Sequence, residues 1–141
     1  MIDKEITMFI NENKVASVCT SNNDEPYCFS CYYSFMEQEG LLIYKSSGDT
    51  KHDKMLLQNQ KIAGTIIPEN VDVISIRGIQ FEGVLMKYSL DLGLKISASY
   101  YLKYPFAIAM PGKLGAIQLD RIKFTDNTRG FGFKQKWERI V

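Results

Sequence analysis

The stretch Leu41-Leu42-Ile43-Tyr44-Lys45-Ser46-Ser47-Gly48-Asp49-Thr50-Lys51-His52 carries the strongest indication of fold and function in this chain. Its first four residues are apolar and indicate a buried strand, and Thr50 begins a segment of helical character. Small hydroxyl side chains, a glycine and two basic side chains therefore meet at a helix N-terminus. Free backbone N–H groups and the positive end of the helix dipole favour anions at such a place, so the stretch predicts a phosphate site.

Helix capping is the alternative interpretation of the same residues. Thr50 followed by Asp53 fits a capping box with Asp in place of Glu or Gln. The run Ser-Ser-Gly-Asp is also common in ordinary loops. Plain capping and phosphate binding both remain open from these residues alone.

Composition and charge limit the class of protein. The chain has 141 residues, which fits a single domain over residues 1–141. Its net charge of +1 offers no field for steering onto nucleic acid, so no nucleic-acid partner is expected. The sequence contains no apolar run of about 18 residues and no signal-peptide pattern at its start, so we expect no membrane span and a cytoplasmic location.

The three cysteines are Cys19, Cys28 and Cys31. Cys28 and Cys31 lie three apart in a predicted strand, where their side chains point to opposite faces. A zinc site would need more ligands than the one histidine and one further cysteine supply. The sequence therefore predicts no metal site and three buried free thiols.

Hydrophobic periodicity predicts seven strands and two or three helices. The first segment, from Ile2 to Ile10, is predicted to be helical, as are the segments Thr50–Gln60 and Leu90–Tyr104. The predicted strands are Lys14–Thr20, Tyr27–Phe35, Leu41–Tyr44, Ile62–Ile67, Val71–Tyr88, Leu114–Phe124 and Phe131–Glu138. Most strands follow one another directly, which favours a mainly β fold: a small antiparallel β-barrel with peripheral helices.

Two of these segments carry finer predictions. In Val71–Tyr88 the apolar residues change face after Arg77-Gly78, which predicts a bulge or sharp bend that Gly78 permits. Arg77 is expected to pair with Glu82 or another carboxylate. In Leu90–Tyr104 the spacing predicts a buried stripe, formed by Leu94, Ala98 and Tyr101.

The order of elements resembles the FMN-binding split barrel of the pyridoxamine-phosphate-oxidase-like superfamily. The segments that carry the resemblance are the hairpin Asn22–Phe35, the stretch Tyr44–His52, Arg77–Gly83 and Lys136–Arg139. Arg77–Gly83, together with residues 122–128 and 130–132, is also similar to a small bacterial split-barrel family of unassigned activity.

The resemblance implies FMN as cofactor and a homodimer with the flavin site at its interface. Thr50, Lys51 and His52 would hold the phosphate, with Ser46 and Ser47 at the strand end beside it. Cys31, Tyr32 and Tyr33 would meet the flavin ring, and Trp137 would cover the site from the partner chain. His52 departs from the family, which usually carries a second Arg or Lys there.

The leading interpretation is an FMN-binding protein that acts as a flavin-dependent oxidoreductase on a small molecule. The sequence indicates no catalytic acid, base or nucleophile, since it has one histidine and no Gly-x-Ser-x-Gly motif. Two alternatives stay open: a flavin or small-molecule binding protein without turnover, and a cofactor-free split-barrel dimer.

Overall fold

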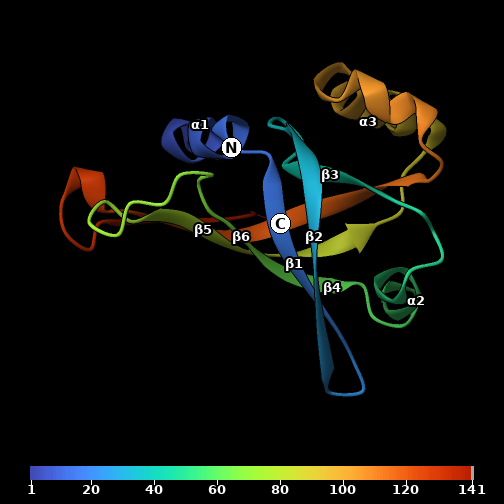
Figure 1. Cartoon of the computed structure of the whole chain (residues 1–141), viewed down its shortest axis with the longest axis horizontal. Helices are drawn as coiled ribbons and strands as arrows, with labels where there is room; N and C mark the ends of the chain where they lie inside the picture. The colour runs from blue at the N-terminus through green and yellow to red at the C-terminus, as the bar shows by residue number, and fades with distance from the viewer. Residues whose placement is uncertain (141) are drawn as a thin grey trace.

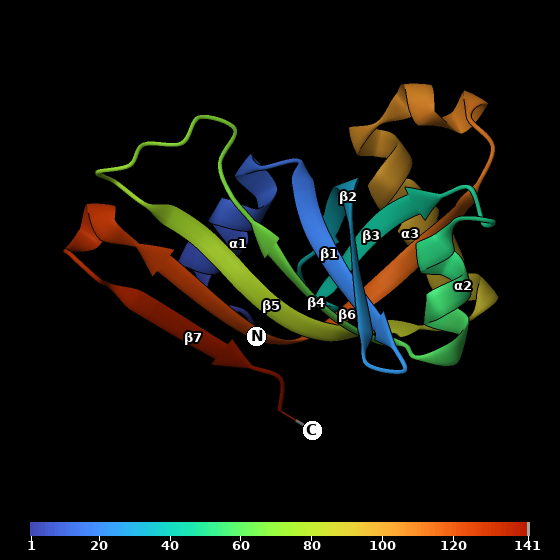
Figure 2. The same cartoon turned by 60° about the horizontal axis from the view of Figure 1, so that its bottom comes forward.

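Seven strands form one antiparallel sheet, and six of them close into a barrel. The computed structural model describes residues 1–140. The sheet order is β3-β2-β1-β4-β5-β6-β7, and pairing of β3 with β6 closes the barrel (Figure 1). Strand β7 stays outside the barrel, at its edge (Figure 2). The mainly β split-barrel fold predicted from the sequence is confirmed.

The elements have the following bounds. The strands are β1 (Val15–Asn22), β2 (Glu25–Met36), β3 (Leu41–Ser46), β4 (Lys61–Ile66), β5 (Arg77–Met86), β6 (Lys113–Asp126) and β7 (Lys134–Glu138). The α-helices are α1 (Lys4–Glu12), α2 (Lys51–Gln58) and α3 (Leu90–Lys103). Two short 3-10 helices follow α3 and β6, η1 (Pro105–Ala109) and η2 (Asn127–Arg129).

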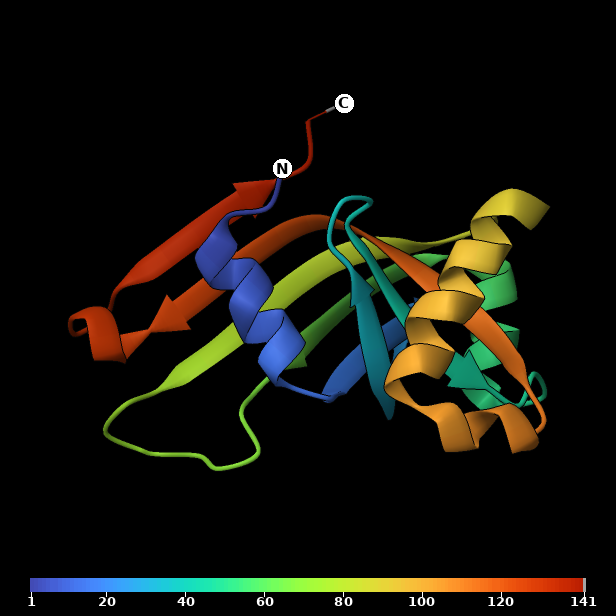
Figure 3. The same cartoon turned by 90° about the horizontal axis from the view of Figure 1, so that it is seen from above.

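Two hydrophobic cores lie around this sheet. The larger core fills the barrel and includes Ile6, Phe9 and Ile10 of α1, which are fully buried as their helical spacing predicts. The smaller core joins α3 to β3 and β6 through Ile43 and Ile96. Figure 3 shows α1 and α3 beside different parts of the sheet.

The hairpin β1–β2 has a fixed register because its turn is short. Asn23 and Asp24 both have positive φ, 51° and 64°, as a two-residue type I′ turn requires. Asn22 pairs with Glu25 next to this turn, and Ser21 pairs with Pro26. Pairs alternate between hydrogen-bonded and non-hydrogen-bonded types away from the turn, and Pro26, which has no N–H, lies in a non-hydrogen-bonded pair.

The predicted strand Val71–Tyr88 is wrong in its first half. Residues 67–76 form no strand, and Val71, Val73 and Ile74 are 65–85% exposed. Strand β4 ends at Ile66, shortly before Pro68, and β5 begins only at Arg77, which pairs with Asp126 of β6. The register shift lies between Glu82 and Gly83, so the prediction of a bulge at Gly78 is also wrong.

Helix α3 buries a different face from the one predicted. Ile96 and Tyr100 are buried, whereas Leu94 is 68% exposed and Ala98 is exposed. The helix carries apolar residues on two sides, and the side with Ile96 and Tyr100 packs against the sheet. Leu94 and Ala98 of the predicted stripe are therefore left on the outside of the molecule, whereas Tyr101 is half-buried against the smaller core.

Arg77 and Asp126 join β5 to β6 at one end of the sheet. Their closest atoms, Arg77 Nε and Asp126 Oδ1, are 3.5 Å apart, and Arg77 also lies 3.7 Å from Glu12. The prediction that Arg77 pairs with a carboxylate is confirmed, with Asp126 and Glu12 as its partners. Asp126 is buried and also accepts a hydrogen bond from the Thr128 N–H at 3.0 Å.

Candidate functional site

The loop from β3 to α2 brings the predicted phosphate residues together at one end of the barrel. Thr50 is the N-cap of α2, and its Oγ1 accepts a hydrogen bond from the Asp53 N–H at 3.2 Å. Gly48 has φ of +94°, a conformation that favours glycine, so the chain can turn sharply into the helix. The capping interpretation of Thr50 is confirmed.

The Asp53 carboxylate organises this loop. Its Oδ2 accepts hydrogen bonds from Thr50 Oγ1 at 2.6 Å, from the Gly48 N–H at 3.0 Å and from Ser46 Oγ. Burial alone would raise the pKa of Asp53, but the hydrogen bonds from Ser46 and Thr50 and the nearby His52 lower it overall. Asp53 is therefore a carboxylate held by donors that a phosphate would also use.

His52 is packed into the barrel end and is not a free cation. Its ring stacks on Phe29 with centroids 3.7 Å apart and an interplanar angle of 10°. Nε2 lies 3.2 Å from Ser46 Oγ and 3.9 Å from Asp53 Oδ1. Burial lowers the pKa of His52, and the opposing effect of Asp53 is smaller. His52 is consequently neutral near pH 7.

Lys51 is an exposed cation at the first position of α2. Its Nζ lies 4.7 Å from the centre of the Tyr27 ring. The backbone N–H groups of Lys51 and His52 occupy the first two positions of the helix, where no acceptor exists within the helix itself. Ser47 is engaged elsewhere, since its Oγ donates to Asp49 Oδ1 at 2.9 Å. The side chain of Lys51 and two N–H groups are thus available to an anion.

The three predicted flavin-contacting residues of β2 do not share a face. Tyr33 is 1% exposed and its hydroxyl donates to the Ile10 carbonyl at 2.6 Å. Cys31 also packs against the barrel core, and burial raises the pKa of its thiol to about 12. Tyr32 alone among the three points outward, with its ring centre 5.8 Å from that of Tyr104. An external ligand can meet Tyr33 only through its backbone, whereas Cys31 is half-buried.

Trp137 lies far from this loop within one chain. It belongs to β7, and Figure 2 shows β7 and α2 at opposite ends of the molecule. Its ring lies beneath the Arg139 guanidinium, with 5.7 Å between the guanidinium carbon and the ring centre. A role for Trp137 at the α2 site therefore requires a second copy of the chain, as the resemblance implies.

A groove of about 570 Å³ lies beside the start of α2. Tyr44, Asp53, Leu56 and Lys113 are among the residues that line it. Its position beside the β3–α2 loop makes it the natural place for the body of a ligand anchored at α2.

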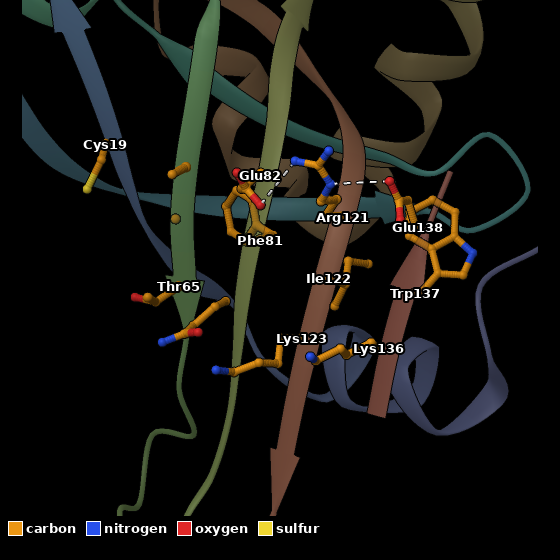
Figure 4. A pocket seen from close by; sticks show the side chains of 13 residues that line it. Cys19, Thr65, Phe81, Glu82, Arg121, Ile122, Lys123, Lys136, Trp137 and Glu138 are labelled. Atoms are coloured by element: carbon orange, nitrogen blue, oxygen red, sulfur yellow. Dashed lines mark hydrogen bonds and ion pairs between the residues drawn. The ribbon is translucent and has the colours of Figure 1, made fainter. Parts of the chain in front are cut away.

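A larger groove of about 830 Å³ lies on the outer face of strands β4 to β7 (Figure 4). Arg121 crosses it and pairs with Glu82 at 3.7 Å and with Glu138 at 3.3 Å. Lys123 and Lys136 add positive charge, and Cys19 lies at its far side (Figure 4). This groove was not among the predicted sites, although the alternation of charged residues along the last strands was a signal for it.

Neither a metal centre nor a membrane helix is found in the described part of the chain. Within residues 1–140, no group of three or more His, Cys, Asp or Glu side chains could hold a metal ion. No helix in the same range has the length and apolarity that crossing a bilayer requires.

Comparison with known proteins places the chain in a family. No family model matches the sequence. A UPF0306 protein of Serratia proteamaculans is 31% identical over 136 residues, which cover 96% of this chain and 94% of that protein. The chain belongs to the UPF0306 family. A second UPF0306 protein, from Klebsiella pneumoniae, is 33% identical over 135 residues, covering 95% of this chain and 91% of that protein.

Solved structures confirm the fold of this UPF0306 chain. A heme binding protein from Mycobacterium smegmatis has a TM-score of 0.80 at 13% identity, and the match covers 96% of this chain and 57% of that one. An FAD-binding protein from Mesorhizobium loti has a TM-score of 0.68 at 13% identity, over 86% and 92% of the two chains. A Clostridium acetobutylicum protein of the pyridoxinephosphate oxidase family has a TM-score of 0.66 at 14% identity, over 97% and 96%.

Proposed function

We propose that this UPF0306 protein is a small-molecule-binding split barrel whose ligand is a flavin of the FMN class. The observation that carries the proposal is the start of α2, where Lys51 is exposed and the first two helix N–H groups have no acceptor within the helix. Proteins of the same fold described as FAD-binding or as members of the pyridoxinephosphate oxidase family support a flavin.

The residues present fit a phosphate group at part of the predicted site. Lys51 and the N–H groups of Lys51 and His52 can take a phosphate without breaking a hydrogen bond, and the one contact that the Lys51 ammonium would exchange is with the Tyr27 ring. Ser46 and Thr50 already donate to Asp53, so a phosphate reaches these two hydroxyls only by displacing that carboxylate. The neutral His52 supplies packing against Phe29 and no charge. Asp53 therefore limits phosphate affinity in this chain.

Fluorescence titration of the ligand-free protein with FMN tests the proposal. We expect saturable binding near one FMN per chain and at least roughly tenfold weaker binding for Lys51→Ala, because a charge-assisted contact contributes about 1.5–3 kcal/mol. Lys54→Ala is the matched control, since it removes the same charge from an exposed position of the same helix. Equal affinities for the two variants would contradict the site, and absence of saturable binding would favour the cofactor-free alternative.

Heme is the other ligand raised by proteins of this fold. The single histidine, His52, has its ring stacked on Phe29 and its Nε2 turned toward Ser46. Axial ligation by this nitrogen would break both contacts, so we favour a flavin. A heme titration followed at the Soret band distinguishes the two ligands.

Redox turnover is proposed as the consequence of flavin binding. A bound flavin supplies electron or hydride transfer, and the protein supplies binding and exclusion of water. Oxidation of NAD(P)H by the FMN-loaded protein, compared with free FMN, separates an oxidoreductase from a protein that binds the flavin without turnover.

We further propose that the protein is a homodimer. Apolar side chains gather on the exposed side of α3 and on η1, where they are between 56% and 84% exposed: Leu90, Leu94, Leu102, Phe106, Ile108 and Met110. A contiguous exposed apolar surface typically marks an interaction site. A second copy of the chain would cover it by presenting the same surface, as two-fold dimers do.

A further inference from the structure

Cys19 and Cys28 face each other across the β1–β2 hairpin. They are directly opposite in the register, and their Sγ atoms are 2.8 Å apart. Counting away from the Asn23–Asp24 turn, this pair is of the non-hydrogen-bonded type, in which the Cα atoms approach to about 4.5 Å. That separation lies within the range of about 4.4–6.8 Å that a disulfide requires.

The third cysteine is separated from this pair by the pleat of the sheet. Cys31 packs against the barrel core, whereas Cys19 and Cys28 lie on the outer face. Cys28 is exposed and Cys19 is half-buried, so the prediction of three buried thiols is wrong for Cys28. The two sulfurs that can meet belong to Cys19 and Cys28, which are nine residues apart, and the pair is not the one that the Cys28-x-x-Cys31 motif would join.

We propose that Cys19 and Cys28 form a reversible thiol–disulfide site with a low-molecular-weight disulfide, such as glutathione disulfide, as oxidant. The exposed Cys28 thiolate attacks one sulfur of the oxidant, forms a mixed disulfide and releases one thiol. The sulfur of Cys19 then attacks the Cys28 sulfur, forms the protein disulfide and expels the second thiol. The two protons from Cys19 and Cys28 end on the two released thiols, so the protein loses two electrons and the oxidant gains them.

The order of attack follows from the surroundings of the two sulfurs. The hydrogen bond with Cys28, assisted by burial, raises the pKa of Cys19 to about 11. Cys19 is therefore the poorer first nucleophile, and its sulfur is held where it can resolve a mixed disulfide on Cys28. Reduction by a dithiol reverses both steps.

The position of the pair gives the reaction a structural effect. Cys19 is one of the residues that line the large outer groove of Figure 4, and it pairs with Ala63 of β4 in the middle of the sheet. Oxidation closes a covalent ring over residues 19–28 and removes the Cys19 thiol from the groove edge. The β1–β2 turn and α3 lie at opposite ends of Figure 1, so the proposed α3 dimer surface leaves the pair accessible. The inference is independent of flavin binding.

Thiol counting and intact mass in the Cys31→Ser chain test the inference, because that variant keeps only the proposed pair. After exposure to glutathione disulfide we expect a chain with no disulfide to a second chain, both thiols lost, a mass lower by two hydrogen atoms, and full reversal by dithiothreitol. Cys28→Ser is the matched control, because it retains two cysteines, Cys19 and Cys31, that lie on opposite faces. This variant should form no internal disulfide, so its mass should not fall by two hydrogen atoms.

The wild-type chain provides a second readout that needs no variant to fold. After oxidation, free thiols are alkylated and the chain is cleaved before Asp24, which separates Cys19 from the other two cysteines. We expect the two fragments to stay linked until reduction, with the alkyl group on Cys31. Mixed disulfides with glutathione that never resolve, two alkylated fragments that separate without reduction, or a link through Cys31 would each overturn the inference.

Discussion

Replacing Asp53 by Asn should strengthen FMN binding, which is the opposite of the usual effect of altering a binding loop. Asp53 places one negative charge beside the start of α2 and accepts hydrogen bonds from Ser46, Thr50 and Gly48. Asn keeps the size and an acceptor oxygen but removes the charge. The two hydroxyls then become available to a phosphate at a lower electrostatic cost.

The size of the effect follows from Coulomb's law. Two unit charges separated by about 6 Å interact by about 3 kcal/mol at an effective dielectric constant of about 20. The Asp53 side chain is 20% exposed, so solvent screening reduces the effect. A gain of about 1.4 kcal/mol remains, which corresponds to roughly tenfold tighter binding.

Fluorescence titration of FMN at pH 7 measures this effect, and raising the salt concentration should reduce it. Asp91→Asn is the control, because it removes the same charge from the first turn of α3. Circular dichroism verifies that α2 and the barrel persist. Equal or weaker FMN binding by a folded Asp53→Asn variant would refute the assignment of the phosphate to this helix start.

Two further predictions concern assembly and pH. Leu94→Glu should convert a dimer into a monomer, measured by light scattering after size-exclusion chromatography, whereas Lys95→Glu on the same helix should not. Acidification should destabilise the protein from about pH 6.5 downward, because burial lowers the pKa of His52 in the folded state and the unfolded chain binds the proton more readily. Urea unfolding at several pH values should show this loss of unfolding free energy, and the loss should be smaller in His52→Gln. The lowered pKa of Asp53 adds a second loss of unfolding free energy at more acidic pH. A wild-type stability that stays constant between pH 7.5 and 5.5 would contradict the burial of His52.

The sequence predicted most elements because their signals are local. The apolar run of β3, the Thr50 cap and the alternation of Gln135 and Trp137 in β7 all depend on neighbouring residues, and the structure retains each of them. The barrel followed from the number and order of the strands. These features need no knowledge of which distant surfaces meet.

The failures involve choices that local sequence leaves open. Helix α3 has two apolar sides, and only contact with the sheet selects Ile96 over Leu94 for burial. Residues 71–76 have strand-forming side chains but no partner strand. The sequence identified Asp53 as part of the helix cap. The hydrogen bond that Asp53 accepts from Ser46 depends on how the whole loop folds back toward β3. The sequence therefore identified the loop that ends at the Thr50 cap of α2, while the state of its hydrogen-bond donors required the structure.

The short turn between β1 and β2 has a consequence for how this family can vary. Surface turns normally tolerate insertions, but one added residue at Asn23–Asp24 would shift the pairing by one and exchange the two faces of β2. Phe29 would then replace Cys28 opposite Cys19, and His52 would lose the ring on which it stacks. A single change in loop length would disable the thiol pair and loosen the ligand end of the barrel together. We therefore expect the length of this turn to be preserved wherever both features are, even if its residues differ.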